Sequence, residues 1–190
     1  MQAPPRPSRE ELVAAANKTI RDVIAPDLSI LFVGINPSLY SAAVGHHFAR
    51  PGNRFWKALH QAGFTDRVLS PFEDQALLER GVGVTNVVRR ATAAADELNP
   101  KELRASARTL IGKVRRFRPL YVAVLGVGAY RLAFDRRGAT VGPQPDAFGG
   151  STWWVLPNPS GRTAAYQLPE LVAWFKRLAA AAGIRARSRS

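Results

Sequence analysis

Two asparagine-containing turns are the part of this sequence best suited to chemistry. Residues 36–38 (Asn-Pro-Ser) follow the apolar run 28–33, and residues 158–161 (Asn-Pro-Ser-Gly) follow the apolar run 153–156. Each pattern predicts a buried strand that ends in a polar turn. Ligand sites in open α/β sheets lie at the carboxyl ends of strands. We therefore expect the two turns to lie on the same rim of one sheet and to face each other across a cleft.

The amide of Asn36 suits a positioning role. It accepts and donates hydrogen bonds, but it cannot take up a proton as a carboxylate would. Such a group catalyses by holding a water molecule in place through its carbonyl oxygen. The alternative is a local role, because asparagine commonly bonds to nearby backbone in turns. The long loop predicted over residues 38–52 and the second turn favour a role in a site.

The elements that hold these turns alternate along the chain. A capping box at residues 8–11 predicts a helix that runs to about residue 24. Residues 38–52 predict a loop without regular structure. Further helices are expected after Asn53, over 71–79, from Pro100, through Tyr130 and Phe134, and over 168–182, with strands at 28–34, 83–88, 121–125 and 152–156. This alternation predicts an α/β fold, a three-layer sandwich whose mainly parallel central sheet is flanked by helices.

Composition restricts the possible classes. The chain has 190 residues, 46% of them hydrophobic, and a formal net charge of +13. We expect a single domain over 8–183, a flexible N-terminus over 1–7 and a basic flexible tail over 184–190. The charge favours nucleic acid as the partner, with an anionic membrane second. The absence of cysteine excludes disulfides and thiolate nucleophiles, and three histidines are too few and too poorly spaced to predict a metal site.

No run approaches the roughly 20 apolar residues of a membrane span, and the N-terminus lacks a signal-peptide core. These features predict a soluble cytoplasmic protein with no membrane partner, and we expect it to be a monomer.

Five motifs occur in order between residues 28 and 178. They are Gly34-Ile35-Asn36-Pro37-Ser38, Gly45-His46-His47-Phe48, Pro51-Gly52-Asn53-Arg54-Phe55-Trp56-Lys57, Gly83-Val84-Thr85-Asn86 and Leu156-Pro157-Asn158-Pro159-Ser160-Gly161. Together they resemble the mismatch-specific uracil-DNA glycosylase and thymine-DNA glycosylase family. The resemblance implies a uracil-DNA glycosylase-like fold and hydrolysis of the N-glycosidic bond of uracil, thymine or an adducted pyrimidine mispaired with guanine. It also implies base excision repair without a cofactor, in a bacterial protein associated with the nucleoid through DNA.

The resemblance assigns roles in base binding. Asn36 would position the attacking water, Phe48 would stack on the flipped base, and Ile35 would lie in the base pocket. Asn86 would read the pyrimidine edge, because an amide matches the N3–H donor and O4 acceptor of uracil. The alternatives are an ordinary core aromatic for Phe48 and a turn residue for Asn86.

A second part of the resemblance concerns the loop that enters the duplex. In the family, a residue after Ser-Gly fills the hole left by the extruded nucleotide, and backbone groups pair with the widowed guanine. Arg162 stands here where bacterial relatives carry an apolar residue, and its guanidinium can stack in the gap and reach phosphates. An exposed arginine on a solvated loop is the alternative. The loop comprises Asn158, Pro159, Ser160, Gly161 and Arg162.

Asp96 is a second candidate for the catalytic role. Among 14 acidic residues, only Asp96 and Glu97 follow a strand end on this rim. A carboxylate there could activate water or stabilise an oxocarbenium-like transition state. Its alternative is a cap for the helix near Pro100. Four further residues are candidates for phosphate or water contacts, or for shaping their loop: Ser38, Ser41, His46 and His47.

The sequence therefore predicts a monofunctional DNA glycosylase, because no lysine is placed for Schiff-base chemistry. Its expected partner is double-stranded DNA that contains U·G or a related mismatch, with single-stranded DNA as a further candidate. A catalytically silent DNA-binding module of the same fold is the alternative. A nucleoside N-glycosidase is a weaker alternative, because the positive charge argues against it.

Overall fold

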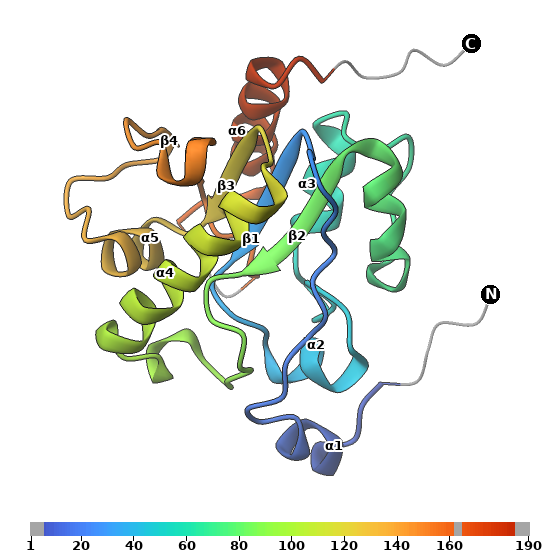
Figure 1. Cartoon of the computed structure of the whole chain (residues 1–190). Coiled ribbons are helices and arrows are strands. Elements are labelled where there is room, and N and C mark those ends of the chain that lie inside the picture. The colour runs from blue at the N-terminus through green and yellow to red at the C-terminus, as the bar shows by residue number, and fades with distance from the viewer. Residues whose placement is uncertain (1–5, 162–164, 185–190) are drawn as a thin grey trace.

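The computed structural model describes residues 6–161 and 165–184, and within them five strands form one sheet in the order β2-β1-β3-β5-β4 (Figure 1). The strands are β1 (Ile30–Gly34), β2 (Val82–Asn86), β3 (Tyr121–Leu125), β4 (Gly142–Pro143) and β5 (Thr152–Leu156). All pairings are parallel except the edge pair of β4 with β5. The predicted mainly parallel sheet is confirmed. Most of both predicted flexible ends, at residues 1–5 and 185–190, lies outside the described residues, as does Arg162.

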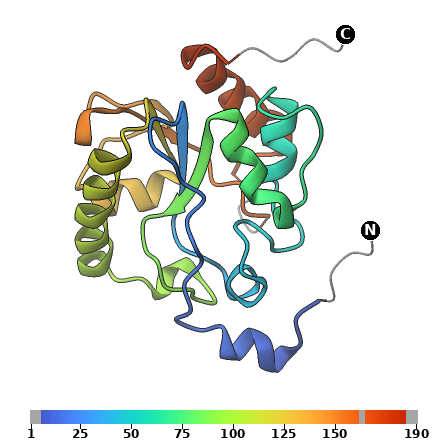
Figure 2. The ribbon, with the colours of Figure 1, turned by 45° about the vertical axis from the view of Figure 1, so that its right-hand side comes forward.

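Helices cover both faces of the sheet, and Figure 2 shows the sheet between them. One face carries α3 (Phe55–Gln61), α6 (Leu168–Ala181) and the 3-10 helix η1 (Pro71–Arg80). The other carries α4 (Pro100–Phe117) and α5 (Val127–Phe134). Because side chains alternate along a strand, Phe32 of β1 packs in the first layer and Val33 in the second. The three-layer sandwich is therefore confirmed.

Strand register brings the ends of four strands to one rim. Gly34, the last residue of β1, pairs with Asn86 at the end of β2, and Leu125 of β3 pairs with Leu156 of β5. The chain leaves β1 toward β2 and then crosses to β3 on the other side of β1. This reversal creates a topological switch point between β1 and β3, where doubly wound sheets open a crevice.

The N-terminal helix is much shorter than its apolar pattern predicts. Helix α1 covers only Arg9–Ala14, behind the predicted capping box. Asn17 then takes a left-handed φ of 63°, and Val23 forms an antiparallel bridge with Val84. Hydrogen bonds with β2 thus replace the helical bonds that the periodicity of residues 15–24 suggested.

The predicted loop over 38–52 contains a helix, α2 (Leu39–Val44). The Ser38 side chain caps it by accepting from the Ser41 amide, and Gly45 ends it at a φ of 76°. Small residues hid this helix in the sequence, although both of its end signals are present. Two 3-10 turns complete the described elements, η2 (Ala95–Glu97) and η3 (Phe148–Gly150).

Candidate active site

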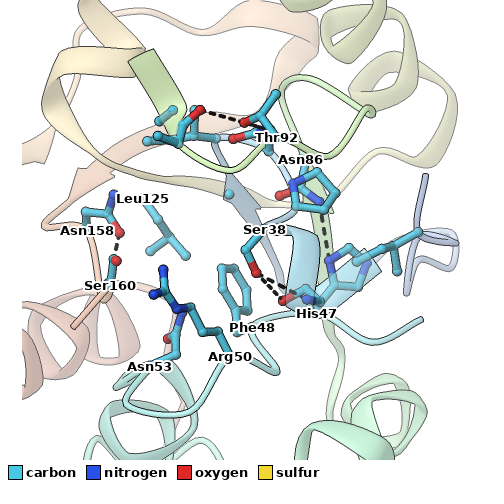
Figure 3. A pocket seen from close by; sticks show the side chains of 18 of the residues that line it. Ser38, His47, Phe48, Arg50, Asn53, Asn86, Thr92, Leu125, Asn158 and Ser160 are labelled. Atoms are coloured by element: carbon cyan, nitrogen blue, oxygen red, sulfur yellow. Dashed lines mark hydrogen bonds between the residues drawn. The ribbon is translucent and has the colours of Figure 1, made fainter. Parts of the chain in front are cut away.

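The carboxyl ends of β1, β2, β3 and β5 surround a pocket of about 580 Å³ (Figure 3). Both asparagine turns line it, one through Asn36 after β1 and the other through Asn158 after β5. Leu125 lines it from β3, which lies between these two strands, and Asn86 lines it from β2, on the other side of β1. The two turns therefore share one cleft, as their positions after the strands predicted. The volume lies within the range of about 300–1,000 Å³ typical of small-ligand sites.

Two hydrogen bonds fix the amide orientation of Asn36. Its Nδ2 donates to the carbonyl oxygen of Arg90 at 3.1 Å and to Oγ1 of Thr92 at 2.7 Å. A backbone carbonyl only accepts, so the nitrogen must lie on that side. Within the described part of the chain, Oδ1 of Asn36 makes no hydrogen bond. The pocket thus receives an amide oxygen that can accept a hydrogen bond from water.

The segment that orients Asn36 is itself held firmly. Thr92 is buried, and its hydroxyl donates to the carbonyl oxygen of Ala94 at 2.6 Å. The Arg90 guanidinium bonds both carboxylate oxygens of Glu102 on α4, at 2.5 and 2.8 Å. This pair lowers the pKa of the Glu102 carboxyl. Thr92 lacked any sequence signal, because its partner Asn36 is distant in the chain.

Phe48 and Asn86 form the wall of the pocket next to Gly34. The Phe48 ring packs against Phe55 with centroids 4.2 Å apart, and Phe48 has a left-handed φ of 52°. A Cβ on Gly34 would lie 2.4 Å from Oδ1 of Asn86 and 3.4 Å from the Phe48 ring. Gly34 therefore leaves the space that the Asn86 amide occupies. Ile35 also lines the pocket, as predicted for the base site.

His47 lies beside Asn86 at the edge of the pocket and is almost completely buried. It is 2% exposed, its Nε2 lies 3.0 Å from the carbonyl oxygen of Arg21, and its Nδ1 lies 3.4 Å from Nδ2 of Asn86. Burial lowers the pKa of His47, so the imidazole is neutral at pH 7. His47 therefore bonds to the protein itself and does not present a nitrogen to an external phosphate.

The remaining predicted contact residues shape the loop around α2. Ser38 bonds to Ser41, and Oγ of Ser41 accepts from the Ala49 amide at 3.1 Å. His46 lies outside the residues that line the pocket, and its Nδ1 is 3.1 Å from the buried Asp74 carboxylate. The two serines line the pocket, whereas His46 packs beside it.

The burial of His47 predicts a pH dependence of stability. The unfolded chain binds a proton on this imidazole near pH 6.5, whereas the folded protein does so only at lower pH. Stability should therefore fall as the pH drops below about 6.5, by up to about 1.4 kcal/mol per pH unit from this one group. The facing charges are Asp74 and Asp22, which raise the pKa, and Lys113, which lowers it. Urea unfolding of the wild type and of His47→Gln between pH 5 and 7.5 measures how the free energy of unfolding changes with pH. His46→Gln is the control. An equal pH dependence in the wild type and in His47→Gln would contradict the prediction.

Asp96 lines the same pocket as Asn36 but occupies an exposed position in η2. Its carboxylate makes no hydrogen bond within residues 6–161 and 165–184. The alternative role as a helix cap is wrong, because Asn99 caps α4 by accepting from the Glu102 amide at 2.8 Å. Asp96 is thus free to face a ligand. Its neighbour Glu97 instead accepts from the Ala94 amide.

Arg54 anchors the second asparagine turn within the turn itself and at Tyr166, which follows it. Its guanidinium donates to the carbonyl oxygens of Pro159 at 3.3 Å, Ser160 at 2.8 Å and Tyr166 at 2.5 Å. Oδ1 of Asn158 accepts from the Ser160 amide at 2.9 Å, which closes the turn locally. A Cβ on Gly161 would lie 2.7 Å from the carbonyl oxygen of Gly52. The motif around residues 52–54 therefore supports this loop, a role that the sequence did not reveal.

Replacing Arg54 should disturb this loop more than the fold. For the DNA glycosylase that the sequence predicts, we expect Arg54→Met to slow base release from duplex DNA by about 10-fold, because each charged hydrogen bond contributes about 1.5–3 kcal/mol. Release from single-stranded DNA should change less, since no stacked duplex has to be opened. Single-turnover rates on both substrates measure the effect. Arg67→Met is the matched control, because Arg67 pairs with Glu73 on the surface. Equal losses of rate on duplex and single-stranded DNA would contradict a role of this loop in opening the duplex.

Arg50 supplies an unpaired cation at the pocket. It is exposed, its side chain extends into the pocket in Figure 3, and that side chain forms neither an ion pair nor a hydrogen bond with any described residue. Among those residues, no three His, Asp or Glu side chains are grouped to hold a metal ion. No helix in the described ranges is long and apolar enough to cross a membrane.

The fold and the pocket define an α/β domain with a polar-lined pocket at the carboxyl ends of its parallel strands. A sequence model of the Uracil DNA glycosylase superfamily matches residues 21–181, and the chain belongs to this superfamily. The fold is similar to the solution NMR structure of a proposed uracil DNA glycosylase from Methanosarcina acetivorans. That comparison gives a TM-score of 0.52 at 20% identity and covers 85% of this chain and 98% of the other.

This match confirms the resemblance at the level of the superfamily. It supports DNA glycosylase activity and DNA as the partner. The mismatch-specific branch stays a prediction.

Proposed function

We propose that this protein is a monofunctional uracil-DNA glycosylase that removes uracil mispaired with guanine. The observation that carries the proposal is the free amide oxygen of Asn36 in one pocket with Asn86 and Phe48. These groups could orient a water, read a pyrimidine edge and stack on a planar base. Because the chain belongs to this superfamily, we expect the pocket to hold the base of a nucleotide in DNA.

In the proposed reaction, the bond between C1′ and N1 of the nucleotide breaks, and its electron pair leaves with uracil. Asn36 accepts a hydrogen bond from water and directs the oxygen lone pair to C1′. Asp96 takes up the proton that the water loses or stabilises the positive sugar. The uracil anion gains the proton that the water released, from Asp96 or through solvent, so the products are free uracil and an abasic site with a hydroxyl on C1′.

The same proposal assigns DNA binding to the basic surface and the second turn. The net charge of +13 favours the phosphate backbone without regard to sequence. The loop that Arg54 anchors would enter the stack, with Arg162 filling the gap next to the widowed guanine. Extrusion costs a few kcal/mol and least for a mispaired base, so mismatches are favoured before the pocket is reached.

Base release from defined oligonucleotides tests the proposal. Duplexes carry one uracil opposite guanine, one uracil opposite adenine or one thymine opposite guanine, beside single-stranded uracil DNA and free deoxyuridine. Alkali-labile strand breaks report abasic sites. Fastest release from U·G supports the proposal. Tight binding of U·G without release from any substrate would instead favour the silent DNA-binding module, and release from free deoxyuridine alone would favour a nucleosidase.

Arg50 should contribute to phosphate binding in this reaction. We expect Arg50→Ala to weaken binding of uracil-containing and undamaged duplexes equally and to reduce the slope of log K against log salt by about 1. Titrations at several salt concentrations measure both effects. Arg80→Ala is the control, because Arg80 pairs with Asp66 away from the pocket. A loss confined to the uracil duplex would contradict a phosphate contact and would point to the departing base.

A further inference from the structure

We infer that His47 sets the orientation of the Asn86 amide and thereby the preference of the pocket for uracil over cytosine. This inference rests on the proposed function, because it gives the base that Asn86 reads. His47 would act through Asn86 as a positioning residue and would not touch the base.

The partner of Nε2 determines the protonation state of the His47 ring. This nitrogen lies 3.0 Å from the carbonyl oxygen of Arg21, which can only accept a hydrogen bond. The proton of the imidazole must therefore sit on Nε2. A neutral imidazole with its proton on Nε2 offers only a lone pair at Nδ1.

That lone pair determines which end of the Asn86 amide faces His47. Nδ1 of His47 lies 3.4 Å from Nδ2 of Asn86, so an amide N–H donates to the ring. The amide oxygen then lies on the side of Gly34, where a Cβ would approach it to 2.4 Å. Oδ1 of Asn86 makes no hydrogen bond within the described chain. Asn86 therefore offers the pocket one free acceptor and its second N–H.

This arrangement matches one pyrimidine and opposes the other. Uracil and thymine present a donor at N3 and an acceptor at O4, which complement the amide oxygen and the second N–H. Cytosine presents an acceptor at N3 and a donor at N4, so it requires the amide turned by 180°. The turned amide would place Oδ1 against the lone pair of Nδ1 and would lose the bond to His47.

Burial makes the constraint effective. His47 is 2% exposed and Asn86 is 7% exposed, so water has little access to replace the lost bond. A buried group left without its partner costs about 1–3 kcal/mol. A free asparagine amide would turn to suit either base, whereas this one is held by the imidazole.

Two substitutions separate the orienting bond from the structural one. His47→Gln can still donate to the Arg21 carbonyl from near the Nε2 position, but it removes the acceptor at Nδ1. His47→Asn places an acceptor oxygen near the Nδ1 position and gives up the Arg21 bond. The probes are duplexes with non-cleavable 2′-fluoro-deoxyuridine or 2′-fluoro-deoxycytidine opposite an abasic-site analogue, so that neither base is paired. The measured quantity is the ratio of the two dissociation constants, with thermal melting to verify folding.

We expect the wild type to prefer the uracil probe, His47→Gln to reduce that preference by about 10-fold or more, and His47→Asn to retain most of it. An unchanged ratio in His47→Gln, or an equal loss in both variants, would overturn the inference. His46→Gln is the control, because His46 lies beside the pocket and bonds to Asp74. A wild type that neither prefers uracil nor releases it would instead refute the proposed function.

Discussion

Asn36→Ala should lower the rate of uracil release by about 100- to 1,000-fold while leaving affinity for the duplex nearly unchanged. The reason is the geometry of the amide, whose nitrogen is bonded to Arg90 and Thr92 and whose oxygen is left to the pocket. Alanine removes the oxygen that orients water but leaves the basic surface and the second turn intact. Single-turnover kinetics on a U·G duplex, together with binding of a non-cleavable analogue, separates the two quantities.

Asp96→Ala, measured beside Asn36→Ala, decides whether the amide or the carboxylate has the main catalytic role. A loss much smaller than that of Asn36→Ala supports water positioning by the amide. An equal or greater loss would transfer the main role to the carboxylate.

Thr92→Val tests the orienting bond, because valine retains the shape of threonine but cannot accept from Nδ2 of Asn36. Release by this variant should fall by about 10-fold, the loss of one good hydrogen bond.

Gly34→Ala should weaken binding of the uracil probe and its release by about 10- to 100-fold, with a smaller effect on stability. The added methyl would lie 2.4 Å from Oδ1 of Asn86, so the amide has to move. That movement breaks the bond between Asn86 and His47 and misaligns the group proposed to read the base. Affinity for 2′-fluoro-deoxyuridine and single-turnover release measure the loss, and chemical unfolding measures stability.

Gly112→Ala is the matched control for this substitution. Gly112 lies in α4, and a Cβ there would meet nothing within 4 Å. Alanine in a helix is more stable than glycine by about 0.5–1 kcal/mol, so this variant should gain stability and keep full activity. Normal uracil release by Gly34→Ala would show that Asn86 does not contact the base as proposed.

The rim of the sheet could be predicted because it depends on local signals. Apolar runs that end in polar turns predicted β1 and β5. Parallel pairing then places the carboxyl ends of these strands at the same rim. Residues 121–125 and the start of α4 at Pro100 followed in the same way from periodicity and a helix-start signal. Residues 15–24 escaped prediction because their pairing with β2 depends on residues far along the chain.

The two asparagine turns show why the site itself was harder to predict. Asn36 and Asn158 begin the same tripeptide, yet Asn36 bonds to Arg90 and Thr92 on another segment while Asn158 bonds to Ser160 two residues away. The local alternative considered for Asn36 is thus wrong, whereas Asn158 does make a bond of that local kind. No spacing in the sequence distinguishes the two, because the difference arises only when β1 and β2 pair.

The bonds of Arg54 to carbonyls in the second turn and beyond it have an evolutionary consequence. Since Ser160 and Tyr166 are tied to the body of the domain through backbone atoms, the identity of the side chains between them is not needed to hold the ends of that segment. Under the proposed function, selection can therefore exchange those side chains and change which opposing nucleotide is tolerated, without a compensating change in the core.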